Sequence, residues 1–412
     1  MGPIALFDKS FLQSLSVDES VWFDHFFLAN VCPIFYVETL ADLEKSAQQG
    51  RTPEQEVGLI ADKFPDMHGT PSLHHACLCI GNLLGFEVPM TGQIPMAGGR
   101  PVKSGGKTGV VFEHSPEAEA FSRWQKREFL EIERRYAQAW RQALSNLDLG
   151  EFKRAVRALG LEGKSCKTLE EAKALAVSIV CSRHKPLKPT KLALMFLNVS
   201  GERRRQILHR WSSTNCPPLS DYAPYVVHVL TVQIFLEIAL AASLISSERP
   251  SNRVDIAYLF YLPFCDIFVS ADRLHRRCAP LFLRKDQQFI WGDDLKKGLC
   301  QLNEHYSHLP ESTKRNGVMS FACNPPKDGD FFVAHIWDRH MPNWRQMQDV
   351  DLSMNSCEQS KIVEEIRNMA DAPSVNPREM DFDPTDTDSL VIQRRVRRMK
   401  GSWYQIPKNL KE

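Results

Sequence analysis

Two short apolar runs, PIALF at residues 3–7 and DIFVS at residues 266–270, most constrain how this chain can fold. Runs of Ile, Leu, Phe and Val with few polar breaks are typical of strands buried on both faces of a parallel sheet. Asp8 follows the first run and Asp272 closely follows the second. Because α/β sheets hold ligands beyond the carboxyl ends of their strands, both carboxylates are candidate site residues. The alternative role is helix capping, since Asp is a preferred N-cap residue.

The elements around these two runs predict an α/β fold. The N-terminal residues indicate a strand, a helix, a second strand at residues 31–37 and a helix at residues 38–48. Strand character returns at residues 266–270 and again at residues 287–292, with a helix between them. This alternation predicts a small parallel sheet covered by helices.

The middle of the chain is mostly helical in pattern, as in residues 115–144, where large apolar side chains recur at helical spacing. We therefore expect two halves of one α/β core, separated by a helical insertion and followed by a partly irregular C-terminal extension. The predicted boundaries are residues 1–48, 49–249, 250–308 and 309–412. Within the extension, residues 371–389 indicate an acidic loop and residues 394–404 a basic end.

The composition of the chain bears on its cellular location and on its binding partners. The 51 Lys and Arg residues nearly balance the 50 Asp and Glu residues, so any contact with nucleic acid depends on local patches. The 11 scattered cysteines favour reduced thiols and a cytoplasmic location. Residues 222–245 are long enough to span a bilayer, but Glu237 lies inside the segment. A charge in mid-span costs ~3 kcal/mol, so we expect a buried core helix and no membrane contact, with a membrane anchor as the remote alternative.

Further acidic residues are predicted to join Asp8 and Asp272. Asp255 begins an apolar segment that leads into the second buried run, 17 residues before Asp272. Glu38 and Asp42 are four residues apart, so they share one face of a helix. If the strands are parallel neighbours, all these carboxylates converge at one edge of the sheet. The alternative is a set of caps and surface acids that never meet.

Converging carboxylates repel one another, and divalent cations relieve that repulsion. Carboxylate oxygens are hard ligands that suit Mg²⁺ or Mn²⁺. Two such ions ~3.5–4 Å apart activate a water molecule and stabilise the leaving oxygen of a phosphodiester. The predicted cofactor is therefore Mg²⁺ or Mn²⁺.

In the order of these motifs the chain resembles the PIN-domain nucleases. After the strand IALF, the segment DKSFL at residues 8–12 is similar to the family pattern Asp-x-Ser-x-aliphatic. The Asp-led segment from Asp255 and the step SAD at residues 270–272 are similar to the family's later helix, strand and Ser/Thr-x-Asp. The resemblance covers residues 1–48 and 250–308, whereas the long insertion and the C-terminal extension depart from a compact PIN domain.

The resemblance implies a PIN-like three-layer α/β/α core and a metal-dependent endonuclease, with RNA favoured over DNA and water as the nucleophile. It implies that Asp8, Asp255 and Asp272 are metal ligands and that Ser10 and Ser270 shape the site.

Two residues are candidates for the acidic residue that the family carries on a helix. The family's Glu-Leu step aligns with Asp42 and Leu43, while Glu38 lies one turn earlier. The alternative function is a PIN-derived scaffold that binds proteins or self-associates through its helical insertion, with weak or no catalysis.

Two basic stretches outside the acidic set are candidate nucleic-acid contacts. Arg203, Arg204 and Arg205 form a dense cluster, and Lys103 and Lys107 lie in a glycine-rich segment that we predict to be a flexible loop. Such side chains can track a phosphate backbone, preferably of single-stranded RNA. The alternative is that both stretches are solvated surface.

Overall fold

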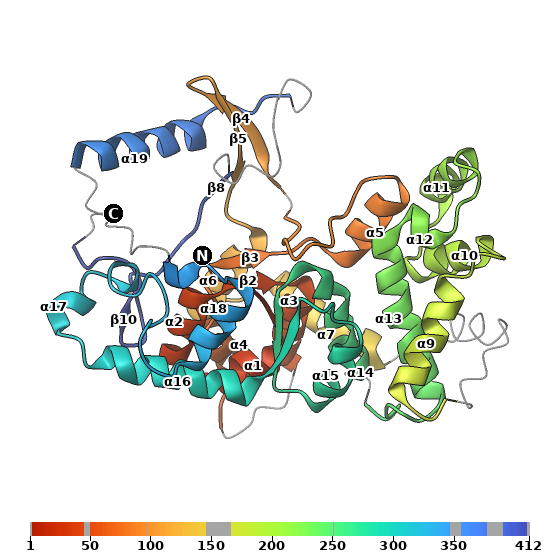
Figure 1. The fold of residues 1–412 in the computed structure, drawn as a ribbon, viewed down its shortest axis with the longest axis horizontal. Coiled ribbons are helices and arrows are strands. Elements are labelled where there is room, and N and C mark those ends of the chain that lie inside the picture. Colours follow the sequence, from red (N-terminus) through yellow and green to blue (C-terminus); the bar gives the residue numbers. More distant parts are fainter. Residues whose placement is uncertain are drawn as a thin grey trace.

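The computed structural model describes residues 2–44, 50–96, 98–145, 166–249, 251–346, 356–376 and 390–409. Its centre is a five-stranded sheet in which every pair of neighbouring strands is parallel, and helices flank this sheet (Figure 1). The strand order is β3 (Gly69–Pro71), β2 (Leu28–Val31), β1 (Ile4–Phe7), β6 (Ile267–Ser270) and β7 (Gln288–Trp291). The predicted α/β class is confirmed.

The two apolar runs are parallel strands of one sheet, as predicted, and the structure places them side by side. β1 pairs with β6 in parallel, with Leu6 opposite Phe268. Both strands are buried almost throughout, which explains their uninterrupted apolar sequence. A strand from one end of the chain therefore lies beside one that begins more than two hundred residues later.

The prediction of a strand at residues 31–37 is wrong. The strand β2 ends at Val31, and helix α3 (Pro33–Leu40) begins at once, followed by the 3-10 helix η1 (Ala41–Glu44). Pro33 sits at the start of α3, where its missing N–H and fixed φ favour a helix. A proline is also disfavoured inside a central strand, because it cannot donate to the ladder.

Helices connect the strands of the sheet and cover it. The N-terminal part contributes α1 (Lys9–Ser14), α2 (Val17–Phe26) and α4 (Pro53–Ala61). The part after the helical region contributes α14 (Asn252–Ala257), η3 (Tyr258–Phe264), α15 (Arg273–Cys278), η4 (Ala279–Leu281) and α16 (Gly292–Ser307). α2 packs against α16, so elements from the two predicted halves share one core.

The predicted helical insertion holds a group of helices at the right of Figure 1. Its members are α5 (His75–Leu83), α9 (Leu169–Val180), α10 (Leu187–Phe196), α11 (Gly201–Ser213), α12 (Leu219–Tyr222) and α13 (Pro224–Ala241). In the described part of the chain, only α13 is long and apolar enough to cross a membrane, and core helices also meet that criterion. Most of α13 is buried, and it packs against α9 and α5.

The segment at residues 115–144 is two helices, α6 (Pro116–Gln125) and α7 (Glu131–Ser145). The break contains Arg127, whose φ is 64°. That left-handed conformation interrupts a helix and is rare for a residue with a Cβ.

The region predicted as a helical insertion also supplies strands. It contributes β3 to the central sheet, and a hairpin of β4 (Arg100–Ser104) and β5 (Lys107–Phe112). The prediction of a flexible loop at this glycine-rich segment is wrong, because Gly105 and Gly106, with φ of 57° and 79°, form a tight hairpin turn. Strand β8 (Leu390–Ile392) pairs with β5, and helix α19 (Ser356–Asp371) packs against this small sheet.

The C-terminal extension begins with short helical elements. They are α17 (Glu311–Lys314), η5 (Val318–Ser320), α18 (Phe332–His340) and η6 (Trp344–Gln346). Of the predicted acidic loop, residues 377–389 lie outside the described residues.

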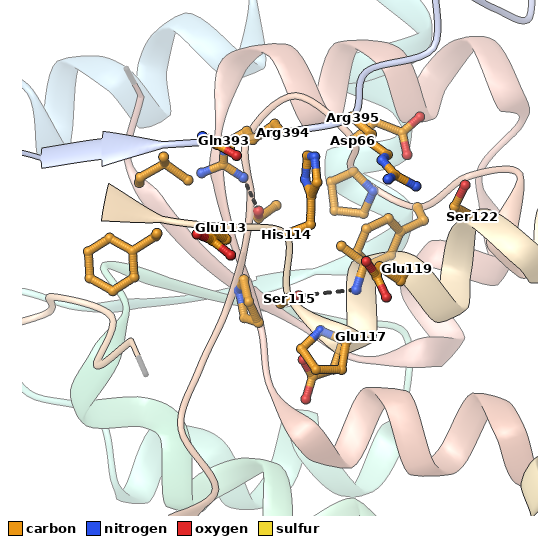
Figure 2. Close-up of a pocket in the computed structure, with 18 of the residues that line it drawn as sticks. Asp66, Glu113, His114, Ser115, Glu117, Glu119, Ser122, Gln393, Arg394 and Arg395 are labelled. Atoms are coloured by element: carbon orange, nitrogen blue, oxygen red, sulfur yellow. Dashed lines mark hydrogen bonds between the residues drawn. The ribbon is translucent and has the colours of Figure 1, made fainter. Parts of the chain in front are cut away.

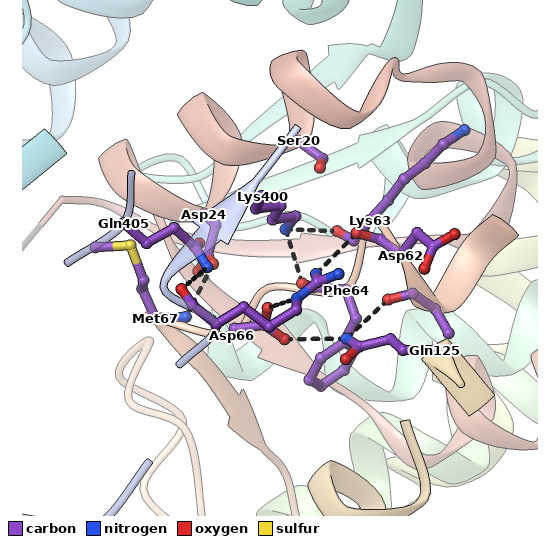
Figure 3. A network of polar contacts seen from close by, with 12 residues as sticks. Ser20, Asp24, Asp62, Lys63, Phe64, Asp66, Met67, Gln125, Lys400 and Gln405 are labelled. Carbon is purple, nitrogen blue, oxygen red and sulfur yellow. Dashed lines mark hydrogen bonds and ion pairs between the residues drawn. The ribbon is translucent and has the colours of Figure 1, made fainter. Parts of the chain in front are cut away.

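The predicted basic end is part of a strap, which we define as residues 390–404 and which includes β9 (Met399–Lys400) and β10 (Trp403–Tyr404). Lys400 is 2% exposed and donates to the backbone carbonyls of Lys63 and Phe64 at 3.2 and 2.8 Å (Figure 3). Arg397 Nε lies 2.6 Å from Asp66 Oδ2. Lys400 and Arg397 therefore serve the fold.

Candidate functional site

Asp8 and Asp272 lie at the same edge of the central sheet, because β1 and β6 are parallel neighbours and each aspartate follows the carboxyl end of its strand. Each also caps a helix: Asp8 Oδ1 accepts from Phe11 N at 2.9 Å, and Asp272 Oδ1 accepts from Leu274 N at 2.5 Å. Capping and membership of a site are therefore compatible here. Each cap occupies one carboxylate oxygen.

The second oxygen of Asp8 is held by two serines, Ser10 and Ser270. Each hydroxyl donates to Asp8 Oδ2 at 2.7 Å. Ser270 is fully buried and also accepts from Asp272 N at 2.9 Å. The two serines fix the rotamer of Asp8, and Ser270 ties it to the start of α15.

His275 belongs to this centre, although no sequence motif pointed to it. Its Nδ1 lies 3.3 Å from Asp8 Oδ2 and 2.8 Å from Ser270 Oγ, and its Nε2 donates to the carbonyl of Asp255 at 2.6 Å. Burial disfavours the charged imidazolium, but the hydrogen bond and the negative charge of Asp8 raise the pKa of His275 to about 9. Burial also acts to raise the pKa of Asp8, yet His275 and Ser10 hold that pKa below its usual value.

Asp255, on α14, is the least compensated acid of the group. Among the described residues, no donor forms a hydrogen bond with its carboxylate. Its pKa is raised to about 7: burial is the largest cause, the positive charge of His275 opposes the rise, and the charges of Glu38, Asp272 and Asp8 add to it. Asp255 therefore lies within electrostatic reach of the three other acids.

Glu38 and Asp42 meet around a lysine that sequence reasoning passed over. Lys9 Nζ lies 3.0 Å from both carboxylate oxygens of Asp42 and 3.2 Å from Glu38 Oε1. The hydroxyl of Tyr258 donates to Glu38 Oε2 at 2.7 Å. Lys9 therefore binds both carboxylates and links Asp42 to Glu38. Glu38 is also close enough to the acids at the strand ends for its charge to raise the pKa of Asp255.

The fit of this centre to Mg²⁺ or Mn²⁺ depends on which carboxylates remain for an ion. In the described ranges, no three His, Cys, Asp or Glu side chains already surround one point as metal ligands do. The reason is local, since His275 and two serines hold Asp8, and Lys9 holds Glu38 and Asp42. The carboxylate of Asp255, which accepts no hydrogen bond from a described residue, is the kind of oxygen ligand that such an ion prefers.

The predicted nucleic-acid residues lie away from the acids. Arg203, Arg204 and Arg205 are exposed on α11, and Lys103 and Lys107 are exposed on the hairpin β4–β5, in separate parts of the molecule (Figure 1). The structure brings neither group to the carboxylates.

Other basic side chains directly follow Asp272 in the sequence and are closer to the carboxylates. Arg273 and Arg276 are exposed on α15, and the guanidinium of Arg276 lies 5.0 Å from the centre of the Trp291 ring, at the end of β7. The signal available in the sequence was the dense run of arginines after Asp272.

A cavity of about 1410 Å³ lies beside the edge strand β3 (Figure 2). Its wall includes Glu113, Glu117 and Glu119 from the end of β5 and the start of α6, facing Arg394 and Arg395 from the strap. None of the five predicted acids lines this cavity. This cavity and the carboxylate centre are therefore separate features.

Comparison of the chain with protein-family models, with curated proteins and with solved structures finds no match.

Proposed function

We propose that this chain is a metal-dependent phosphodiester hydrolase, a PIN-like endonuclease that acts on RNA in preference to DNA. One observation carries the proposal. Asp8 and Asp272 follow two neighbouring parallel strands at one sheet edge, and Asp255 is near enough for their charges and that of Glu38 to raise its pKa. No hydrogen bond from a described residue gives the Asp255 carboxylate a structural role.

In this proposal Asp8, Asp255 and Asp272 hold the ion. When bound, Mg²⁺ or Mn²⁺ lowers the pKa of a coordinated water and offsets charge on the phosphate. Ser10 and Ser270 keep Asp8 turned toward the centre through their hydroxyls. Arg273 and Arg276, exposed beside Asp272, would bind the phosphates that flank the scissile bond.

A second function, a catalytically weak scaffold, is favoured by a different observation. Lys9 and His275 already neutralise much of the acidic charge of the centre. A PIN-derived protein that no longer needs a metal would have such internal partners, and its helical region would then serve for protein contacts.

Cleavage assays with the Asp272→Asn variant separate the two functions. Asn caps a helix about as well as Asp, so this variant should keep its fold while losing one metal-binding charge. With Mn²⁺ and single-stranded RNA or DNA, the hydrolase should cleave RNA faster than DNA, and Asp272→Asn and a chelator should each abolish cleavage.

The matched control is Asp294→Asn, on the exposed side of α16, which should cleave like the wild type. Cleavage that survives both the chelator and Asp272→Asn would indicate a contaminant. A wild type that cleaves no RNA or DNA substrate would favour the scaffold.

A further inference from the structure

We propose that the cavity beside β3 is a binding site for a short peptide that carries one acidic and one basic side chain. Arg394 and Arg395 of the strap bind the carboxylate of the peptide, and Glu117 and Glu119 of α6 bind its basic group. This site is separate from the carboxylate centre, so the inference does not rest on the proposed function.

The cavity lies where two sheets meet. Gly69 and Pro71 of β3 form part of its wall on the side of the central sheet, and Phe112 of β5 and Ile392 of β8 form part of it on the side of the small sheet. Ligand sites occur preferentially at such junctions between folded units. The volume of about 1410 Å³ exceeds the ~300–1,000 Å³ that is usual for small-molecule sites, so the cavity has room for several amino-acid residues.

One wall carries positive charge that no described side chain pairs with. Arg394 is half-buried and donates to the carbonyl oxygen of Gly69 and, at 3.0 Å, to Thr70 Oγ1, which are both uncharged acceptors. Among the described residues, neither Arg394 nor the exposed Arg395 has a carboxylate partner. Burial lowers the pKa of Arg394, and the charge of Asp24 acts against this shift. A carboxylate from a ligand would offset the cost of that burial and occupy further donors of the guanidinium.

The opposite wall carries negative charge that is also unpaired. Glu117 is half-buried and Glu119 is exposed, and both lie in the first turn of α6. In the part of the chain that the structure describes, neither carboxylate accepts a hydrogen bond or forms an ion pair. Glu113 differs, because Arg100 Nε lies 3.4 Å from its carboxylate and compensates its charge.

The two sets of charges face each other across the cavity (Figure 2). No ion pair joins Arg394 or Arg395 to Glu117 or Glu119, so a space separates the two sets. A ligand that carries both charges would compensate both walls, whereas one wall would repel a ligand of a single sign. Phe112 and Ile392 add apolar surface for the part of the ligand between its charges. A peptide provides this combination of an acidic, an apolar and a basic side chain.

The test is affinity selection from three pools of pentapeptides with blocked termini, read by mass spectrometry in the presence of a chelator. The mixed pool carries Lys at one end and Glu at the other, in both orders. The other two pools carry Lys at both ends or Glu at both ends, and the positions between are random in every pool. We expect the protein to retain peptides from the mixed pool and not from the other two. Calorimetry then measures the dissociation constants of the retained peptides.

Charge reversals of exposed cavity residues test where the peptide binds. Arg395→Glu and Glu119→Lys should each weaken binding of the retained peptides by about fivefold or more, because each loses at least one ion pair. The matched controls are Arg398→Glu and Glu128→Lys, which are exposed outside the cavity wall and should bind like the wild type. Thermal melting checks the fold of each variant. If a reversal fails to fold, the neutral variants Arg395→Gln and Glu119→Gln make the same comparison.

Binding of mixed peptides that both cavity variants weaken and both controls preserve would support the peptide site. No retention from any pool, or a preference for a pool of one sign, would overturn it. Binding that both cavity variants leave unchanged would place the peptide elsewhere and would also overturn it. Since the assay contains no RNA and no free metal ion, failure of this inference would leave the proposed function standing.

Discussion

His275 joins two parts of the candidate site through its two ring nitrogens. Nδ1 faces Asp8, and Nε2 donates to the backbone carbonyl of Asp255. Its pKa is raised from 6.5 to about 9, so the folded chain holds a proton that the unfolded chain releases. The stability from this proton is fully present below pH 6.5 and is lost as the pH rises through about 9.

Denaturant unfolding of the wild type in chelator should therefore show a decrease in stability across this alkaline range. One proton accounts for at most about 1.4 kcal/mol per pH unit. The variant His275→Gln should be less stable at neutral pH and should lack this slope. An equally steep slope in the variant would assign the proton to another group.

In Asp255 the folded state favours the neutral form of the side chain, whereas in His275 it favours the charged form. Its pKa is raised from 3.8 to about 7, so the stability linked to its proton is present below pH 3.8 and is lost as the pH rises through about 7. In chelator, Asp255→Asn should raise the free energy of unfolding by about 1 to 2 kcal/mol at neutral to alkaline pH, a figure reduced for partial exposure.

The same variant should lose the stabilisation by Mn²⁺, because it lacks a ligand. The measurement is a urea titration with and without the ion, with Asp294→Asn as the matched surface control. A loss of stability in Asp255→Asn in chelator would mean that the carboxylate has a favourable partner.

At this scale the sequence predicted the acids but not their partners. Asp8 and Asp272 each follow a buried strand, and that local pattern was sufficient to place them at one edge. His275 and Lys9 gain their roles from contacts made only in the folded chain, since Lys9 meets Asp42 across 33 residues. No periodicity or spacing records such a contact.

At the scale of elements, the strap of residues 390–404 fastens the C-terminal extension to the core. The ring of Trp403 packs edge-on against Trp22 of α2 with centroids 4.6 Å apart, and its Nε1 donates to Asn303 of α16 at 2.8 Å. Trp403 is 2% exposed, so the strap buries a large side chain between two helices of the core.

Trp403→Ala should therefore destabilise the protein by about 3 to 5 kcal/mol, the usual loss for a buried Trp. Ile392→Ala is the control on the same strap, because Ile392 is 37% exposed and should change stability little. The measurement is the free energy of unfolding by urea. A loss in Trp403→Ala no larger than in the control would show that the strap is a loose attachment.

Two element boundaries have a local signal that outweighs composition. Pro33 marks the start of a helix, although the apolar composition of residues 31–37 suggests a strand. Gly105 and Gly106 mark a hairpin turn, although the glycine-rich composition there suggests a flexible loop. β3 is a different case, because a three-residue strand that ends in Pro71 carries no strand pattern. Its pairing with β2 becomes visible only in the folded sheet.

At the scale of the whole molecule, buried neutral histidines should make the fold sensitive to acid. Burial lowers the pKa of His25 to about 4, of His75 to about 3 and of His228 to about 4. The unfolded chain takes up these protons near pH 6.5, so stability should fall as the pH drops below that value.

With three such groups the slope approaches about 4 kcal/mol per pH unit, and the proton that Asp255 binds in the folded state offsets part of it. Urea unfolding between pH 7 and pH 5 measures this slope, and His228→Gln should reduce it. A stability that stays flat or rises on acidification in this range would contradict the buried neutral state of these rings.

The overall arrangement was predictable only in outline. The α/β class and the presence of β1 and β6 in one parallel sheet followed from two apolar runs, because a strand buried on both faces has a recognisable sequence. The order of all five strands could not be read from the chain, since the residues between β3 and β6 contain nothing that fixes where the chain re-enters the sheet.

The central claim is that Asp8, Asp255 and Asp272 together hold a divalent ion. Crystals grown with Mn²⁺ and measured near the manganese absorption edge would locate the ion directly by its anomalous scattering. We predict a strong peak in contact with carboxylate oxygens of these three aspartates. Anomalous density only elsewhere, or none in crystals that are stable in Mn²⁺, would contradict it.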